Sequence, residues 1–120
     1  MPPLPAPPIS PLTMAILLAL AKEDQHGYAL MQDVEAQTGG ALRPGTGSLY
    51  AALERLLDEG LIEDAPAPAG GGGDGRRKYF RITSSGRAAA RAEARRMAGV
   101  LEIAREKNVI GDVPSLRGAR

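Results

Sequence analysis

Apolar residues recur at helical spacing in four segments of the chain. The first segment begins at Ser10-Pro11, a capping serine followed by proline at the first helical position, and it is apolar on almost all sides. Three more helices are predicted at about residues 27–38, 46–59 and 84–108, where apolar positions lie three or four residues apart. The second and third of these four helices each end at a glycine, a residue that readily stops a helix.

Two short β-strands are predicted between the third and fourth helices, at residues 61–64 and 77–82. The segment that joins them, residues 66–75, is rich in proline and glycine and predicts a loop. Three helices followed by a β-hairpin is the element order of a winged helix-turn-helix, in which the third helix reads DNA and the hairpin forms the wing. We therefore predict a mainly α fold with a winged-helix domain at residues 10–83 and a dimerisation helix at residues 84–108.

The composition excludes several other classes of protein. There is no cysteine and only one histidine, so we expect no disulfide, no metal site and no cofactor, and we do not expect an enzyme. The longest apolar run is about ten residues, too short to cross a bilayer, which favours a soluble, cytoplasmic protein without a membrane partner. Residues 1–9 are rich in proline and residues 109–120 follow the last helix, and both are expected to be flexible tails.

Charge is divided unevenly between the two halves of the chain. Residues 1–64 carry three basic and nine acidic side chains, whereas residues 65–120 carry twelve basic and five acidic ones. The basic second half makes double-stranded DNA one candidate partner, and a solvated basic face without a partner is the other interpretation. The acidic first half instead fits a winged helix that binds proteins and not DNA, which we keep as the alternative function.

The third helix is the candidate element for reading DNA. Its leucines fix the buried face, so the small and polar residues at its start face outward. Thr46 is expected to cap this helix and, with Arg43 and Ser48, to donate to phosphates at the helix N-terminus. Tyr50 either bonds a phosphate or only packs, and Glu54 either accepts from a cytosine amino group or only faces solvent. The candidate DNA contacts here are Arg43, Thr46, Ser48, Tyr50, Ala51 and Glu54.

The predicted wing carries three consecutive cations, Arg76, Arg77 and Lys78. At a hairpin end they would lie over phosphates or reach into the minor groove, and a solvated hairpin end is the alternative. His26 precedes the second helix, where a turn or capping role is expected over that of a metal ligand or pH sensor. Tyr28 follows in the same helix and is expected in the core.

The fourth helix and the surplus apolar surface of the first predict a homodimer. Apolar residues of the fourth helix alternate at spacings of four and three, which makes a short heptad seam rich in alanine. The first helix needs cover on more than one side, and a second subunit could supply it. A long helix that folds back on its own domain is the alternative. The residues expected at the interface are Met14, Leu18, Ala90, Ala94, Met97, Leu101 and Ala104.

Four local sequences occur in the order and spacing of one family. Residues 26–30 open the second helix with His-Gly-Tyr-Ala-Leu, and residues 47–53 open the third with Gly-Ser-Leu-Tyr-Ala-Ala-Leu. Residues 55–62 close the third helix, and residues 75–87 form the second wing strand and enter the last helix. Taken together, over about residues 10–104, these sequences resemble the PadR family of transcriptional regulators.

This resemblance implies a two-fold homodimer whose last helices cross and whose wings flank the recognition helices. It also implies repression through a pseudo-palindromic operator, released by a small molecule or another signal of unknown identity. The chain departs from the commoner pattern at Ala51, where many members have proline, and at Phe80, where tyrosine is commoner. A single C-terminal helix is typical of the short branch of the family, and with four aromatic residues a pocket for flat aromatic ligands is poorly equipped.

Overall fold

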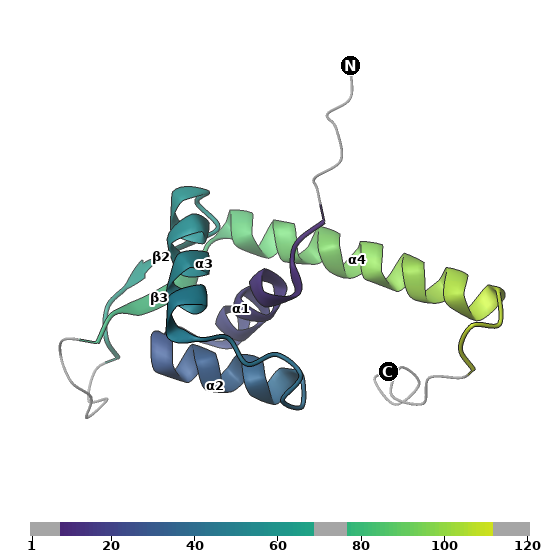
Figure 1. The fold of residues 1–120 in the computed structure, drawn as a ribbon. Coiled ribbons are helices and arrows are strands. Elements are labelled where there is room, and N and C mark those ends of the chain that lie inside the picture. The colour runs from purple at the N-terminus through teal and green to yellow at the C-terminus, as the bar shows by residue number, and fades with distance from the viewer. Residues whose placement is uncertain (1–7, 69–76, 112–120) are drawn as a thin grey trace, which may run out of the picture.

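The computed structural model describes residues 8–68 and 77–111 (Figure 1). The elements in chain order are α1 (Pro11–Lys22), β1 (Gln25–His26), α2 (Gly27–Gln37), α3 (Thr46–Asp58), β2 (Ile62–Ala65), β3 (Tyr79–Ile82) and α4 (Ser84–Glu106). This order confirms the mainly α fold with a small sheet after the third helix. The predicted tails at residues 1–7 and 112–120, and the predicted loop at 69–76, lie outside the described residues.

Helix α1 is the central helix of the domain. The Ser10 hydroxyl accepts from the Thr13 N–H at 3.2 Å, which confirms the predicted cap. Helices α2, α3 and α4 and strand β3 all pack on α1, so its apolar surface is covered on several sides by the same chain. Met14 is consequently only 7% exposed, which corrects the expectation that a second subunit covers it, whereas Leu18 remains 46% exposed.

A three-stranded antiparallel sheet with the order β1-β3-β2 lies at one side of the helices. Strands β2 and β3 form the predicted wing, and β1 is a third strand that the sequence did not indicate. β1 is only two residues long, Gln25 opposite Phe80 and His26 opposite Tyr79, and two residues carry no periodicity. Its pairing places His26 beside Tyr79, the first residue of β3, and so joins the start of α2 to the wing.

Helix α4 is fixed to the turn that follows α3. The Thr83 hydroxyl donates to the Gly60 carbonyl at 2.7 Å and accepts from the Gly86 N–H at 3.0 Å, while the Thr83 N–H donates to the Leu61 carbonyl at 3.1 Å. A Cβ at Gly86 would overlap the Leu61 carbonyl oxygen and lie 2.8 Å from Ile82 Cγ1, so only glycine allows this close approach. The direction of α4 is therefore set at its first turn.

Helix α4 runs along the domain and then projects past it (Figure 1). Its buried residues, Gly86, Ala90 and Glu93, all lie in the first half. Met97, Leu101 and Ala104 continue the same face at helical spacing, yet Met97 is 50% exposed and Leu101 and Ala104 are only partly covered. Of the predicted interface residues in α4, Ala90 thus packs within its own chain and Ala94 is exposed. Within the described ranges no helix is long and apolar enough to cross a bilayer.

Candidate nucleic-acid interface

Helix α3 begins at Thr46 as predicted, but Thr46 does not cap it. Gly45 occupies the N-cap position with an extended backbone (φ −74°, ψ 167°), and among the described residues no side chain caps this helix. An N-cap residue has an extended backbone, and Thr46 is already helical, so its hydroxyl is not at the capping position. The first amide groups of α3 therefore remain available to an external acceptor such as a phosphate oxygen.

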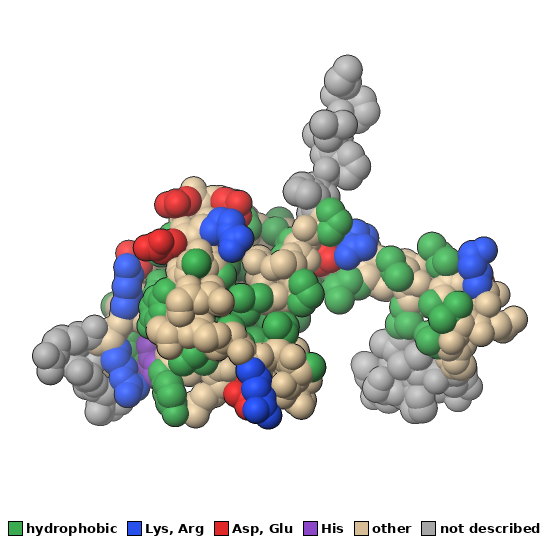
Figure 2. Space-filling model, viewed as in Figure 1, with side chains coloured by type: hydrophobic (Ala, Val, Ile, Leu, Met, Phe, Trp, Pro, Cys, Tyr) green, Lys and Arg blue, Asp and Glu red, His purple; other side chains and the backbone are tan. Residues whose placement is uncertain are grey.

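The outward face of α3 carries small and polar side chains at its start. Leu49, Ala52, Leu53 and Leu56 are buried, and Thr46, Gly47, Ser48, Ala51 and Glu54 are exposed. This matches the orientation predicted from the leucine spacing, with Ala52 as an additional buried residue. The acidic residues Glu54 and Asp58 lie in the C-terminal half and Glu59 is the C-cap, and Figure 2 shows acidic side chains gathered at that end of α3. The N-terminal half is therefore the part that suits an anionic partner.

Tyr50 rests on the first residue of α2. A Cβ at Gly27 would overlap the Tyr50 hydroxyl and lie 2.7 Å from Cζ, so the ring end of Tyr50 occupies the space that a side chain there would need. Tyr50 nevertheless remains 43% exposed at the start of α3. Of the two interpretations of Tyr50, packing is observed, and the exposed part of the ring leaves it accessible to a bound molecule.

Replacing Gly27 with alanine is expected to lower the free energy of unfolding by at most about 1 kcal/mol, because the new methyl group overlaps only the end of the half-exposed Tyr50 ring, which can turn away. Urea unfolding followed by circular dichroism measures this cost. In a Tyr50→Ala background the overlapping ring is gone, so the same Gly27→Ala change should cost much less. An equal cost in both backgrounds would show that Tyr50 does not constrain position 27.

Tyr28 is 58% exposed, which corrects the expectation that it lies in the core. The buried residues of α2 are Gly27, Leu30 and Val34, and Tyr28 is turned about 100° from the first of them around the helix. The helical period alone, applied from Leu30 and Val34, could have placed it outside. Tyr28 thus adds an exposed phenol next to the contact between Gly27 and Tyr50, and sequence reasoning missed it.

The wing cations differ in how they are held. Lys78 Nζ lies 3.5 Å from Asp64 Oδ1 in a pair of which both side chains are more than half exposed, so the pair is weak. Arg77 Nη1 lies 2.9 Å from His26 Nε2, which ties the base of the wing to the start of α2. Arg76, the third predicted wing cation, lies outside the described residues. Figure 2 shows basic side chains beside the histidine on this side of the molecule.

His26 is the N-cap of α2, as expected for a capping histidine. Its Nδ1 lies 3.3 Å from the Ala29 amide nitrogen, and its ring meets Tyr79 edge-on at a centroid distance of 5.2 Å. Burial, followed by the nearby Arg77 charge, lowers the pKa of His26 from its ordinary value of 6.5. The imidazole is therefore neutral at pH 7.

Arg43 lies in the loop before α3 and points over the turn that ends α2. Its Nε is 3.5 Å from Glu35 Oε1, and the two side chains are 72% and 49% exposed. An ion pair this exposed contributes little to stability and exchanges readily for another anion. Arg43 thus lies three residues before α3 in the chain, with its side chain directed at the end of α2.

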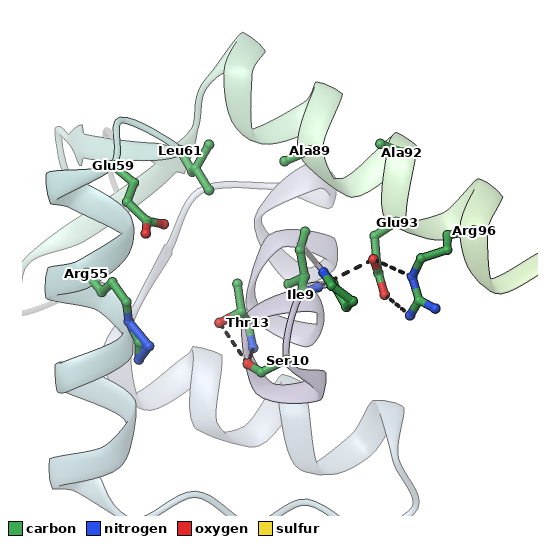
Figure 3. A pocket seen from close by; sticks show the side chains of 11 residues that line it. Ile9, Ser10, Thr13, Arg55, Glu59, Leu61, Ala89, Ala92, Glu93 and Arg96 are labelled. Atoms are coloured by element: carbon green, nitrogen blue, oxygen red, sulfur yellow. Dashed lines mark hydrogen bonds and ion pairs between the residues drawn. The ribbon is translucent and has the colours of Figure 1, made fainter. Parts of the chain in front are cut away.

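A cavity of about 850 Å³ lies between the start of α1, the end of α3 and α4 (Figure 3). Arg55 and Glu59 reach it from α3, across from Ala89 and Ala92 of α4. None of the described residues that line it is aromatic. Its wall includes Glu93, whose carboxylate is paired with Arg96 and accepts from the Ile9 N–H at 3.4 Å, and the hydrogen bond from Arg96 lowers the Glu93 pKa.

The described residues offer hydrogen-bond donors and cations, and they contain no cluster of three His, Cys, Asp or Glu residues able to hold a metal ion. Helix α3 offers the amides of its first turn and the exposed hydroxyls of Thr46 and Ser48. Helix α2 adds the exposed hydroxyl of Tyr28, and the wing adds the guanidinium of Arg77. Such donors are the groups by which proteins hold the phosphates of a nucleic acid.

Comparison with known proteins relates this chain to transcriptional regulators. The model of the Transcriptional regulator PadR-like family matches residues 16–92. An uncharacterized protein of Lysinibacillus sphaericus is 34% identical over 77 residues, which are 64% of this chain and 69% of that protein. The structure of a PadR-like transcriptional regulator from Bacillus cereus is 26% identical, covers 84% of this chain and 93% of that chain, and has a TM-score of 0.65.

Bacillus subtilis PadR in complex with operator DNA is also 26% identical, with a TM-score of 0.54 over 67% of this chain and 44% of that chain. The family match runs from α1 through the wing into the first half of α4, so it includes every described element of the site. Since it spans more than half of the sequence, this chain belongs to the PadR-like family of transcriptional regulators.

Proposed function

We propose that this chain is a DNA-binding transcriptional repressor that acts as a homodimer on a pseudo-palindromic operator. The observation that carries the proposal is the convergence of three elements on two adjacent residues. Tyr50 of α3 rests on Gly27, and Arg77 at the base of the wing contacts His26. The recognition helix, the start of α2 and the wing are thereby held as one surface, the arrangement by which a winged helix contacts a duplex.

The distribution of charge along α3 supports the proposed orientation on DNA. Its N-terminal half offers amides that no described side chain caps and the hydroxyls of Thr46 and Ser48, with Arg43 close in the chain. Its C-terminal end carries Asp58 and the C-cap Glu59, which phosphates would repel. The helix would therefore enter the major groove by its start, with Ala51 at the close approach to the bases.

The projecting half of α4 supports the homodimer. Met97 is 50% and Val100 is 54% exposed, on the continuation of a face that is buried in the first half of the helix. An apolar stripe that no other described element covers is typical of a surface that a second copy covers. Two crossed α4 helices would bury this stripe and place two α3 helices for two half-sites.

The cavity gives the proposed repressor a place for an effector. A small molecule in it would contact both Arg55 of α3 and the Ala89–Ala92 turn of α4. Binding there would couple the helix that reads DNA to the helix that joins the subunits. We propose a ligand without a large aromatic system, because the described lining offers no ring for stacking.

Replacing Arg76, Arg77 and Lys78 with alanine is expected to weaken binding to every DNA sequence. The slope of log K against log salt should become shallower by up to roughly 0.9 per lost phosphate contact on each subunit, because fewer counterions are released. Fluorescence anisotropy at several salt concentrations measures this. The matched control replaces Arg91, Arg95 and Lys107, three exposed cations of α4 and the turn after it, and should leave the slope unchanged. An equal slope for the wing variant would mean that the wing faces away from DNA.

Retention on random duplex DNA and on heparin tests the function against its alternative. The acidic end of α3, with Glu54, Asp58 and Glu59, favours a protein-binding winged helix as the second candidate. A DNA-binding dimer should be retained on duplex DNA at moderate salt and should elute as salt rises. Elution in the void volume at low salt would reject DNA binding and support the second candidate.

A further inference from the structure

His26 faces two groups that can only donate hydrogen bonds. The Ala29 N–H lies at its Nδ1, with 3.3 Å between the nitrogens, and the Arg77 guanidinium lies at its Nε2, with 2.9 Å between the nitrogens. An arginine side chain has no acceptor and stays protonated, and a backbone amide has none on nitrogen. Each contact is a hydrogen bond only when the histidine nitrogen concerned carries a lone pair.

A neutral imidazole has one such nitrogen, and the protonated ring has none. The two contacts of His26 are therefore mutually exclusive as hydrogen bonds. With the proton on Nδ1 the ring accepts from Arg77 and does not cap α2, whereas with the proton on Nε2 it caps α2 and no longer accepts from Arg77. The Arg77 contact is shorter and charge-assisted, so the tautomer that accepts from Arg77 is favoured when no anion competes for the guanidinium.

We propose that His26 is a positioning residue that changes tautomer when Arg77 moves to a DNA phosphate, an inference that rests on the proposed function. In the free protein Nε2 holds the guanidinium at the base of the wing. On DNA the phosphate takes Arg77, solvent removes the proton from Nδ1 and supplies one to Nε2, and Nδ1 then accepts from Ala29. The ring is neutral both before and after this exchange, because one proton leaves Nδ1 and one is gained at Nε2.

The surroundings of the ring allow the proton to change place without a movement of the side chain. His26 is paired with Tyr79 in the sheet, and the Tyr79 ring meets the imidazole edge-on at an interplanar angle of 89°. The ring is thus fixed between the wing and α2 in either tautomer. The cap formed on DNA would order the first turn of α2, where Gly27 supports Tyr50 of α3. Contact of the wing with phosphate would in this way stabilise the position of the recognition helix.

The chain has one histidine, so its imidazole nitrogen signals need no assignment. Long-range ¹H–¹⁵N correlation spectra of the ¹⁵N-labelled full chain at pH 7.5 distinguish a protonated ring nitrogen from one with a lone pair. In the free protein we expect the proton mainly on Nδ1. Arg77→Ala should shift the ratio of tautomers toward Nε2–H by at least about tenfold, since a charge-assisted hydrogen bond is lost. Lys78→Ala, which removes the neighbouring wing charge, should leave the ratio unchanged.

Adding a short random-sequence duplex at low salt should produce the same shift in the unaltered chain, with binding followed in parallel by anisotropy. A free protein already protonated on Nε2, or an Arg77→Ala variant with an unchanged ratio, would overturn the proposal. Binding by anisotropy without a change of tautomer would overturn the transfer of Arg77 to phosphate. A chain that binds no DNA would reject the proposed function and this transfer with it, while the dependence of the tautomer on Arg77 would stand.

Discussion

Replacing both Met97 and Leu101 with aspartate is expected to convert the proposed dimer of this chain into folded monomers. Both residues lie on the face of α4 that is buried near the start of the helix and is exposed or only partly covered in its second half. Two carboxylates on an apolar interface would have to be desolvated without partners, which costs several kcal/mol for each ion. The dimer dissociation constant should therefore rise at least about 100-fold. Analytical ultracentrifugation over a range of protein concentrations measures this change.

The control for this experiment is Arg95→Asp, which changes the net charge by the same amount. Arg95 is exposed on the side of α4 opposite Met97, so the variant should remain a dimer. Circular dichroism of both variants checks that α4 and the domain remain folded. A folded Met97→Asp, Leu101→Asp protein that sediments as a dimer would show that the subunits join elsewhere.

Changing Ala51 to glutamate is expected to abolish specific DNA binding, with a loss of at least about 100-fold in affinity. Ala51 is exposed on the outward face of α3, one turn before Glu54. A bulky carboxylate there would separate the helix from the groove and would repel the phosphates on either side. The fold should be retained, because the position is exposed and glutamate is a good helix former.

Ala88→Glu is the matched control, since it makes the same change at an exposed helical position of α4. Anisotropy titrations with an operator selected from random DNA should give nearly unchanged affinity for this variant. Unfolding by urea should give similar midpoints for both variants. If the Ala51→Glu protein is folded and binds with the original affinity, α3 does not read the major groove.

The helices and their outward faces could be predicted because each depends on local periodicity. The Ser10 cap, the start of α3 at Thr46 and the exposure of Ala51 all follow from residues within one or two turns. Strand β1 could not be predicted, because it is two residues long and exists only through its pairing with β3. The burial of Met14 likewise depends on which elements pack on α1. The sequence pattern showed only that the apolar surface of this helix had to be buried, and not which element buries it.

The exposure of the residues proposed for the start of α3 was predictable, but the contacts around them were not. The contact of Arg77 with His26 joins residues 51 positions apart, and that of Tyr50 with Gly27 joins two helices. No sequence pattern indicates either contact, because each arises from the packing of whole elements against one another. Tyr28 is a different case, because the period of α2 already turned it outward and its apolar ring led to the wrong expectation.

The central claim is that two copies of α3 and its wing bind two half-sites of one operator. Selection of bound fragments from random DNA, followed by hydroxyl-radical footprinting of the enriched sequence, tests it most directly. We expect a pseudo-palindromic sequence with two protected segments centred about one helical turn, ~34 Å, apart or a multiple of it, and no protection by the Ala51→Glu variant. Selection rounds that enrich no sequence, or a footprint of one undivided segment without two-fold symmetry, would contradict the account.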